Sequence, residues 1–155
     1  MQMPKSPSLK LQKHLFFKAL LLLFPFLSFH PAPPVLQIQI SGLESAQGKV
    51  MLSIYNTADS YMQIEKAQVL RAIEVRGTQN INVSINDLPA GEYAVSCYHD
   101  LNGNGKLDKN LVGIPAEPYA FSNNVRPKFR AATWEETRFY LNAQGNTIAL
   151  KLENW

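Results

Sequence analysis

A run of acidic and amide side chains is the part of this sequence best suited to chemistry. The stretch HDLNGNGKLDKN, residues 99–110, places oxygen-bearing side chains on alternate positions before a glycine that allows a sharp bend. Calcium takes about six to eight oxygen ligands, and short loops supply them with this spacing. The pattern matches the first half of an EF-hand loop, D-x-[DN]-x-[DN]-G, but Leu111 stands where the bidentate glutamate belongs. The expected calcium ligands are Asp100, Asn102, Asn104, the backbone carbonyl of Lys106, Asp108 and, as a candidate for the missing carboxylate, Glu117.

The charge of this ligand set indicates weak binding. Asp100 and Asp108 bring two carboxylates, or three with Glu117. Sites with few charged ligands belong to the class with dissociation constants of roughly 10⁻⁴ to 10⁻³ M, which fill where calcium is abundant. The alternative is a metal-free turn, because Asn and Asp side chains also hydrogen-bond to the backbone of their own segment.

A second candidate for chemistry is the pair Cys97 and His99, two positions apart on one expected strand. A nucleophile and its base must lie within hydrogen-bond reach of each other, and neighbours at this spacing rarely converge. A lone cysteine on an apolar strand face is typically a small buried hydrophobe. A hydrolase that uses Cys97 and His99 is therefore the least favoured interpretation, and we expect no enzyme.

The elements that must position these residues are β-strands. Apolar and polar side chains alternate in short stretches separated by turn residues, which predicts strands with one buried face. In the stretch 66–77 the alternation slips between Leu70 and Ala72, which indicates a bulge or break. We expect an all-β, antiparallel sandwich of about seven strands. The predicted strands lie within residues 35–41, 49–56, 66–77, 80–86, 92–100 and 146–154.

Residues 111–138 break this rhythm. They form an expected long loop before the last two strands, with three prolines and several aromatic residues. Loops of this length are often functional. Tyr119, Phe121 and Trp134 could cover one end of the sandwich, or they could form a surface for an unknown glycan, peptide or envelope protein. Within this loop, Thr133 and Glu136 have the spacing of a capping box, which predicts one helical turn.

The N-terminal segment reads as a secretory signal. Four lysines and no acidic residue precede an apolar run at residues 19–29, which is too short to span a bilayer as a helix. We expect a signal peptide at residues 1–32 with an uncertain cleavage site, and one sandwich domain at residues 33–155. The protein is then exported to the periplasm, the cell surface or the medium. The alternative is an uncleaved segment, which would be the one membrane attachment.

Charge and cysteine content limit the remaining functions. Residues 33–155 carry six Lys, five Arg and twelve acidic residues, a net charge of −1, so the domain has no basic excess to bind nucleic acid. Cys97 is the only cysteine, so the chain has no internal disulfide to hold its loops.

The stretch LPAGEYAVSCYHDLNGNGKLDKNLVGIPAEPYAFSNN, residues 88–124, resembles a bacterial family of exported proteins, domain of unknown function 2141. The resemblance rests on the D-x-N-x-N-G-K-L-D loop at 100–108 and on G-I-P-x-E-x-Y-x-F-S-N-N at 113–124. The residue after Tyr119 is often Gly in that family, and here it is Ala120. The LPAGEY corner also resembles transthyretin-like and carboxypeptidase-regulatory-like sandwiches. The resemblance implies export and an immunoglobulin-like or transthyretin-like fold, and it implies no activity.

The residues together predict an exported, noncatalytic β-sandwich module. Its acidic loop would bind Ca²⁺ and thereby order the aromatic-rich loop for a ligand or partner. The alternative is a structural component of a cell-envelope assembly, in which the same loop is a metal-free turn.

Overall fold

The computed structural model describes residues 1–3, 32–77 and 80–155. The chain divides into residues 1–31 and 32–155, and all the described helices and strands lie in the second unit. Most of the expected signal peptide therefore lies outside the described residues. No helix in the described ranges combines the length and apolar character needed to cross a membrane.

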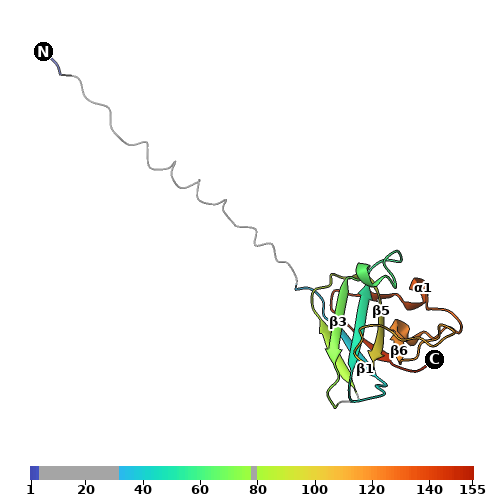
Figure 1. The fold of residues 1–155 in the computed structure, drawn as a ribbon. Helices are drawn as coiled ribbons and strands as arrows, with labels where there is room; N and C mark the ends of the chain where they lie inside the picture. Colours follow the sequence, from blue (N-terminus) through green and yellow to red (C-terminus); the bar gives the residue numbers. More distant parts are fainter. Residues whose placement is uncertain (4–31, 78–79) are drawn as a thin grey trace. The chain divides into compact units, whose positions relative to one another are not determined.

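The described residues form a mostly β fold with eight strands in two sheets (Figure 1). The three-stranded sheet has the order β4-β1-β8, and the five-stranded sheet has the order β3-β2-β5-β6, with β7 paired to β5. The predicted all-β fold is confirmed, with one strand more than expected. The strands are β1 (Leu36–Ser41), β2 (Lys49–Tyr55), β3 (Val69–Glu74), β4 (Ile81–Ile85), β5 (Gly91–Asp100), β6 (Tyr119–Phe121), β7 (Phe139–Leu141) and β8 (Asn146–Lys151).

One apolar core joins the two sheets. The inward-facing side chains of β1 and β8, from the smaller sheet, belong to the same buried cluster as those of β2 and β5 from the larger one. Leu36, Ile38 and Ile40 alternate with polar residues along β1 and are at most 1% exposed. This alternation is what buries one face of each strand and leaves the other in water.

The pairing of β1 with β8 corrects the expectation of a purely antiparallel sandwich. These strands run parallel, in a register that matches Leu36 with Asn146 and Ser41 with Lys151. Alternation fixes which side chains face the core, but it carries no information on the direction of a neighbouring strand. The other strand pairs are antiparallel.

The bulge expected in β3 is wrong. Six consecutive residues of β3 pair with β2 in one unbroken register, from Lys49 opposite Glu74 to Ile54 opposite Val69. The strand lies at the edge of its sheet, and Leu70 is 48% exposed. Because an edge strand can expose both of its faces, the alternation of apolar and polar residues can be interrupted without a bulge in the backbone.

The segment at residues 111–138 is less irregular than expected. It contains the short strand β6, a 3₁₀ turn η2 (Ser122–Asn124) and the helical turn α1 (Trp134–Thr137); a further 3₁₀ turn, η1 (Ile64–Lys66), precedes β3. The predicted capping box is confirmed, because the Glu136 carboxylate accepts the backbone N–H of Thr133 at 2.8 Å. Three residues are too few for alternation to reveal a strand, which is why β6 was not predicted.

Candidate functional site

The acidic loop leaves the end of β5, a strand held between β2 and β6. Its first residue, Asp100, is fully buried. The Asp100 carboxylate accepts backbone N–H groups from Gly103 at 2.7 Å, Asn104 at 3.1 Å and Gly105 at 2.8 Å. Gly103 and Gly105 have positive φ angles of 74° and 77°, which glycine adopts without the steric penalty of a Cβ atom. Asp100 therefore anchors the loop by binding its backbone.

Two amide side chains connect the middle of the loop to Asp108. Nδ2 of Asn102 donates to Oδ2 of Asp108 at 2.7 Å, and Nδ2 of Asn104 donates to Oδ1 at 3.0 Å. The amide oxygens accept backbone N–H groups instead, from Asn104 at 3.0 Å and from Lys106 at 2.7 Å. Asn104 thus contacts Asp100 through its backbone N–H and Asp108 through its side-chain amide.

Glu117 joins the two ends of the loop. Its Oε1 accepts the backbone N–H of Leu101 at 2.9 Å, and its Oε2 accepts that of Asp108 at 3.0 Å. The side chain is 4% exposed. A further bond from the backbone N–H of Ala116 to the carbonyl of Asp108, at 2.8 Å, holds the segment beside the loop. The sequence placed Glu117 at this loop, and the structure brings it there.

The loop carries concentrated negative charge. Among the described residues, no Lys, Arg or His forms an ion pair with Asp100, Asp108 or Glu117. Burial and, after it, the charges of Asp100, Glu117 and Asp108 together raise the pKa of Tyr98 to about 12. The Tyr98 hydroxyl donates to the carbonyl of Gly105 at 2.9 Å. The three carboxylates therefore lie near one another, around the Tyr98 hydroxyl group.

The oxygen atoms of this loop suit a hard cation, but their arrangement is complete without one. Carboxylate, amide and carbonyl oxygens are the ligands that calcium prefers. In the ranges that the structure describes, no three His, Cys, Asp or Glu side chains converge as metal ligands do. The Asn102 and Asn104 amides also direct N–H groups, not oxygens, at Asp108. Both amides would have to turn before their oxygens faced a cation beside Asp108.

Cys97 and His99 lie on the inner face of β5. Burial raises the pKa of the Cys97 thiol to about 12. Nε2 of His99 donates to the carbonyl of Gln47 at 2.8 Å, and Nδ1 accepts the backbone N–H of Glu44 at 3.4 Å. Both ring nitrogens are therefore hydrogen-bonded to backbone groups of the segment between β1 and β2. Neither nitrogen is free to accept a proton from the thiol.

The aromatic residues proposed as a ligand surface are largely buried and lie in two groups. Tyr119 and Phe121 are 8% and 7% exposed, and their rings meet edge to face with a centroid distance of 5.7 Å. Trp134 packs instead against Tyr61, at a centroid distance of 6.2 Å. These side chains mainly cover the outer face of the larger sheet.

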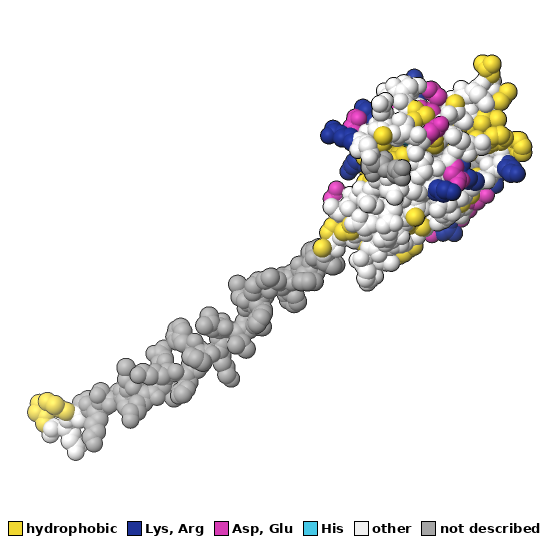
Figure 2. All heavy atoms as spheres, turned by 90° about the horizontal axis from the view of Figure 1, so that it is seen from below, with side chains coloured by type: hydrophobic (Ala, Val, Ile, Leu, Met, Phe, Trp, Pro, Cys, Tyr) yellow, Lys and Arg dark blue, Asp and Glu magenta, His cyan; other side chains and the backbone are white. Residues whose placement is uncertain are grey.

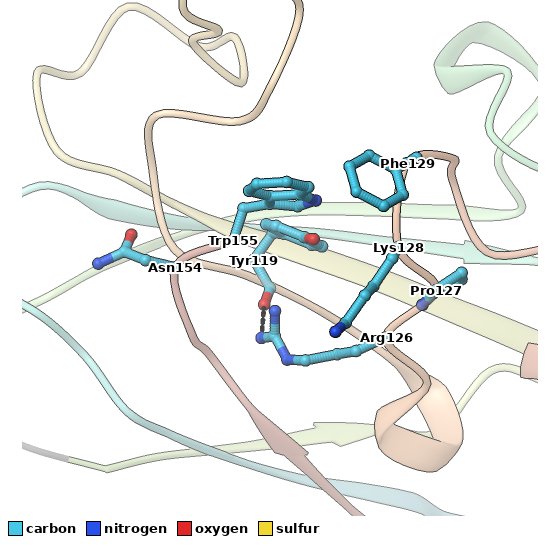
Figure 3. Close-up of a pocket in the computed structure, with 7 residues that line it drawn as sticks. All are labelled: Tyr119, Arg126, Pro127, Lys128, Phe129, Asn154 and Trp155. Atoms are coloured by element: carbon cyan, nitrogen blue, oxygen red, sulfur yellow. Dashed lines mark hydrogen bonds between the residues drawn. The ribbon is translucent and has the colours of Figure 1, made fainter.

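A pocket that the sequence analysis did not identify lies next to this cover (Figure 3). It has a volume of about 350 Å³. Phe129 and Trp155 are exposed at 85% and 49%, and their rings meet edge to face at 5.6 Å. The only sequence feature that pointed to this pocket was the segment after β6, which contains aromatic and basic residues. Nothing in the sequence indicated that this segment lies beside the residues after β8. The pocket is lined by Tyr119, Arg126, Pro127, Lys128, Phe129, Asn154 and Trp155.

The fold and the loop define a two-sheet, mostly β domain with an acidic loop at the end of its central strand. The profile of the family described as "Uncharacterized protein conserved in bacteria (DUF2141)" matches residues 38–149. This match covers most of the chain, so the chain belongs to that family, as its loop motifs predicted. Neither the curated proteins nor the solved structures gave a match.

Proposed function

We propose that this chain is an exported, noncatalytic binding module whose loop at 100–108 takes up Ca²⁺ with weak affinity. The observation that carries the proposal is that the carboxylates of Asp100 and Asp108, together with that of Glu117 hydrogen-bonded to the loop backbone, have no cationic partner among the described residues. Asp100 and Glu117 hold the loop through its backbone N–H groups, and Asp108 lies between them in the hydrogen-bond network. A divalent cation would relieve the repulsion between these charges.

Uptake of the cation requires a small rearrangement. The Asn102 and Asn104 amides donate to Asp108 in the structure, and a cation beside Asp108 replaces these two donors. Their oxygens, the Lys106 carbonyl and water then complete the coordination. Because existing hydrogen bonds must be given up, we expect a dissociation constant of roughly 10⁻⁴ to 10⁻³ M.

The same hydrogen bonds favour one competing function. A loop whose carboxylates already accept donors from its own backbone and amides is stable as a turn. In that case the chain is a structural part of an envelope assembly and does not respond to calcium.

The surroundings of Cys97 and His99 support a noncatalytic module. A reactive thiol needs a lowered pKa and access to solvent, whereas the Cys97 thiol is buried and its pKa is raised. The His99 ring is occupied by two backbone groups. Neither side chain is placed to attack a substrate.

Thermal unfolding with and without calcium tests the proposal. If the dissociation constant is near 1 mM, then 10 mM CaCl₂ stabilises the fold by about 1.4 kcal/mol, a rise of several degrees in Tm that EDTA reverses. Asp108→Asn should abolish this rise. Asp87→Asn, a change of the same chemistry at an exposed site outside the loop, should keep it. The absence of any calcium effect on the unsubstituted protein would leave the metal-free turn.

Export is tested separately. The lysine-rich start and the apolar run at 19–29 support it. Fractionation of cells that express the full chain should place the protein outside the cytoplasm, with an N-terminus near residue 33. Recovery of the full-length chain from the cytoplasm would contradict export without affecting the calcium test.

A further inference from the structure

The pocket between the 126–129 segment and the end of the chain is built on a rigid base. Tyr119 and Glu153 exchange two backbone hydrogen bonds, at 3.1 and 3.2 Å. Arg126 fixes the junction from the side: its guanidinium donates to the carbonyl of Tyr119 at 2.6 Å and pairs with the Glu153 carboxylate at 2.7 Å. Its charge also lies 4.9 Å from the centre of the Tyr119 ring. The side chain of Arg126 therefore holds Tyr119 and Glu153 together.

The rim of this pocket is apolar and exposed. Phe129 is 85% exposed although it is a large aromatic residue, and Trp155 beside it is 49% exposed. Figure 3 shows the rings of Phe129, Trp155 and Tyr119 grouped on one side of the pocket. Exposed aromatic groups in a hollow are common anchors for ligands.

The backbone at Phe129 is strained. Its φ angle is 64°, in the left-handed region that bulky side chains rarely adopt and that costs about 1–3 kcal/mol. This conformation holds the ring at the rim and in contact with Trp155, without burying it. Strain of this kind gathers at binding sites, which makes Phe129 a candidate for contact with a ligand.

The charged side chains of the pocket indicate the charge of its ligand. Its lining contains two cationic side chains and no carboxylate side chain. Arg126 is neutralised by Glu153, whereas Lys128 is exposed and forms no ion pair with any described residue. In the view of Figure 3 the Lys128 and Arg126 cations lie on the same side of the three rings. An anionic group on the ligand would pair with the Lys128 ammonium group.

We propose that this pocket binds an acidic saccharide, such as a uronic acid unit at the end of a glycan. The C–H face of a sugar ring stacks on the electron-rich face of Trp155 or of Phe129, whose rings stand at 68° to each other. The carboxylate meets the exposed Lys128 ammonium group. A volume of about 350 Å³ suits one or two sugar rings, since ligand pockets begin at about 300 Å³.

This inference rests on the proposed role as a noncatalytic binding module, but it does not require calcium. Calorimetric titration of the protein with digalacturonate and with its uncharged methyl ester tests it, once in EDTA and once in CaCl₂. We expect the acid to bind and the ester to bind about tenfold more weakly. Lys128→Gln should lower the affinity for the acid to that of the ester, whereas Lys66→Gln, at an exposed lysine outside the pocket, should change neither.

Phe129→Gly separates binding from folding. Glycine accepts the left-handed backbone, so Tm should stay the same or rise while the affinity for digalacturonate falls about tenfold or more. Tyr140→Ala removes another exposed aromatic ring, which is 60% exposed and lies outside the pocket, and should leave the affinity unchanged. Full binding by Phe129→Gly, or no binding of digalacturonate by the unsubstituted protein at millimolar concentration in either buffer, would overturn the proposal. Failure of the calcium test alone would leave it standing.

Discussion

The backbone N–H of Asp108 donates to Oε2 of Glu117 at 3.0 Å, while Oε1 of the same carboxylate accepts the N–H of Leu101 at 2.9 Å. One buried carboxylate therefore holds both ends of the loop at 100–108. This contact explains how an isolated acidic loop keeps its shape at the edge of a β domain. It also places a third negative charge beside Asp100 and Asp108.

Glu117→Gln should destabilise the protein although it changes the side-chain volume little. An amide has one oxygen, so its NH₂ group would face one of the two backbone N–H donors and leave that donor unpaired. A buried unpaired group costs about 1–3 kcal/mol, which urea unfolding can measure. Glu65→Gln, on the exposed turn η1, is the matched control and should change the free energy of unfolding little. Equal effects of the two substitutions would contradict the role assigned to Glu117.

Gly48 and Gly105 should differ in their tolerance of alanine. A Cβ atom at Gly48 would lie 2.3 Å from the carbonyl oxygen of Asp100, and φ there is +86°. At Gly105 φ is +77°, but no atom lies within 4 Å, so alanine adds only backbone strain of about 1–2 kcal/mol. Gly48→Ala should therefore lose clearly more stability than Gly105→Ala. Gly91→Ala, where φ is not positive and the nearest atom is 3.7 Å away, should lose least.

Asn104→Asp separates the calcium site from the plain turn. In EDTA the new carboxylate at position 104 would lie against the carboxylate of Asp108 and repel it. Asp108 would also lose the hydrogen bond that the Asn104 amide now donates to it. The variant should therefore melt at a lower temperature than the unsubstituted protein. In CaCl₂ the added charge should tighten binding about tenfold, because affinity rises with the number of charged ligands. Asn110→Asp, whose oxygen caps two backbone N–H groups outside the loop, should show neither effect. A lower Tm with no gain in affinity would favour the metal-free turn.

The buried thiol of Cys97 should make stability depend on pH in the alkaline range. Burial raises its pKa from 9.0 to about 12 in the folded state, so the folded state holds this proton more tightly than the unfolded state. The resulting contribution is complete below pH 9 and is lost as the pH rises towards 12. Urea unfolding from pH 8 to pH 11 should show this fall, and Cys97→Ala should make it smaller. Rapid labelling of Cys97 by a thiol reagent in the native protein would contradict its burial.

Sequence periodicity predicted the strands well, because strands such as β1 and β2 bury one side and expose the other. Periodicity failed where contacts between segments distant in the sequence determine the structure. The parallel pairing of β1 with β8 joins segments more than a hundred residues apart in the chain, and the three residues of β6 are too few to show a period. The exposed edge strand β3 produced a false bulge.

The site shows the same division. Spacing alone placed Asp100, Asn104 and Asp108 on one loop, because that geometry is local. The direction of the Asn102 and Asn104 amides was not predictable, since it depends on which backbone groups the folded loop presents. The pocket at Phe129 and Trp155 depends on pairing between β6 and the residues after β8, which no local pattern encodes.

The charged side chains on the surface are mixed in sign. Figure 2 shows Lys and Arg side chains scattered among Asp and Glu on the face it presents, with no single basic area. This agrees with the near-neutral charge of residues 33–155.

The most direct test of the calcium proposal is an NMR titration of the side-chain amides of Asn102 and Asn104. Both amides donate to Asp108 in the structure, so their NH₂ signals should move when they turn towards a cation. We expect these signals to shift and saturate with a dissociation constant of roughly 10⁻⁴ to 10⁻³ M for calcium, and Asp108→Asn to abolish the shift. Unchanged signals at 10 mM CaCl₂ would contradict a calcium site in this loop.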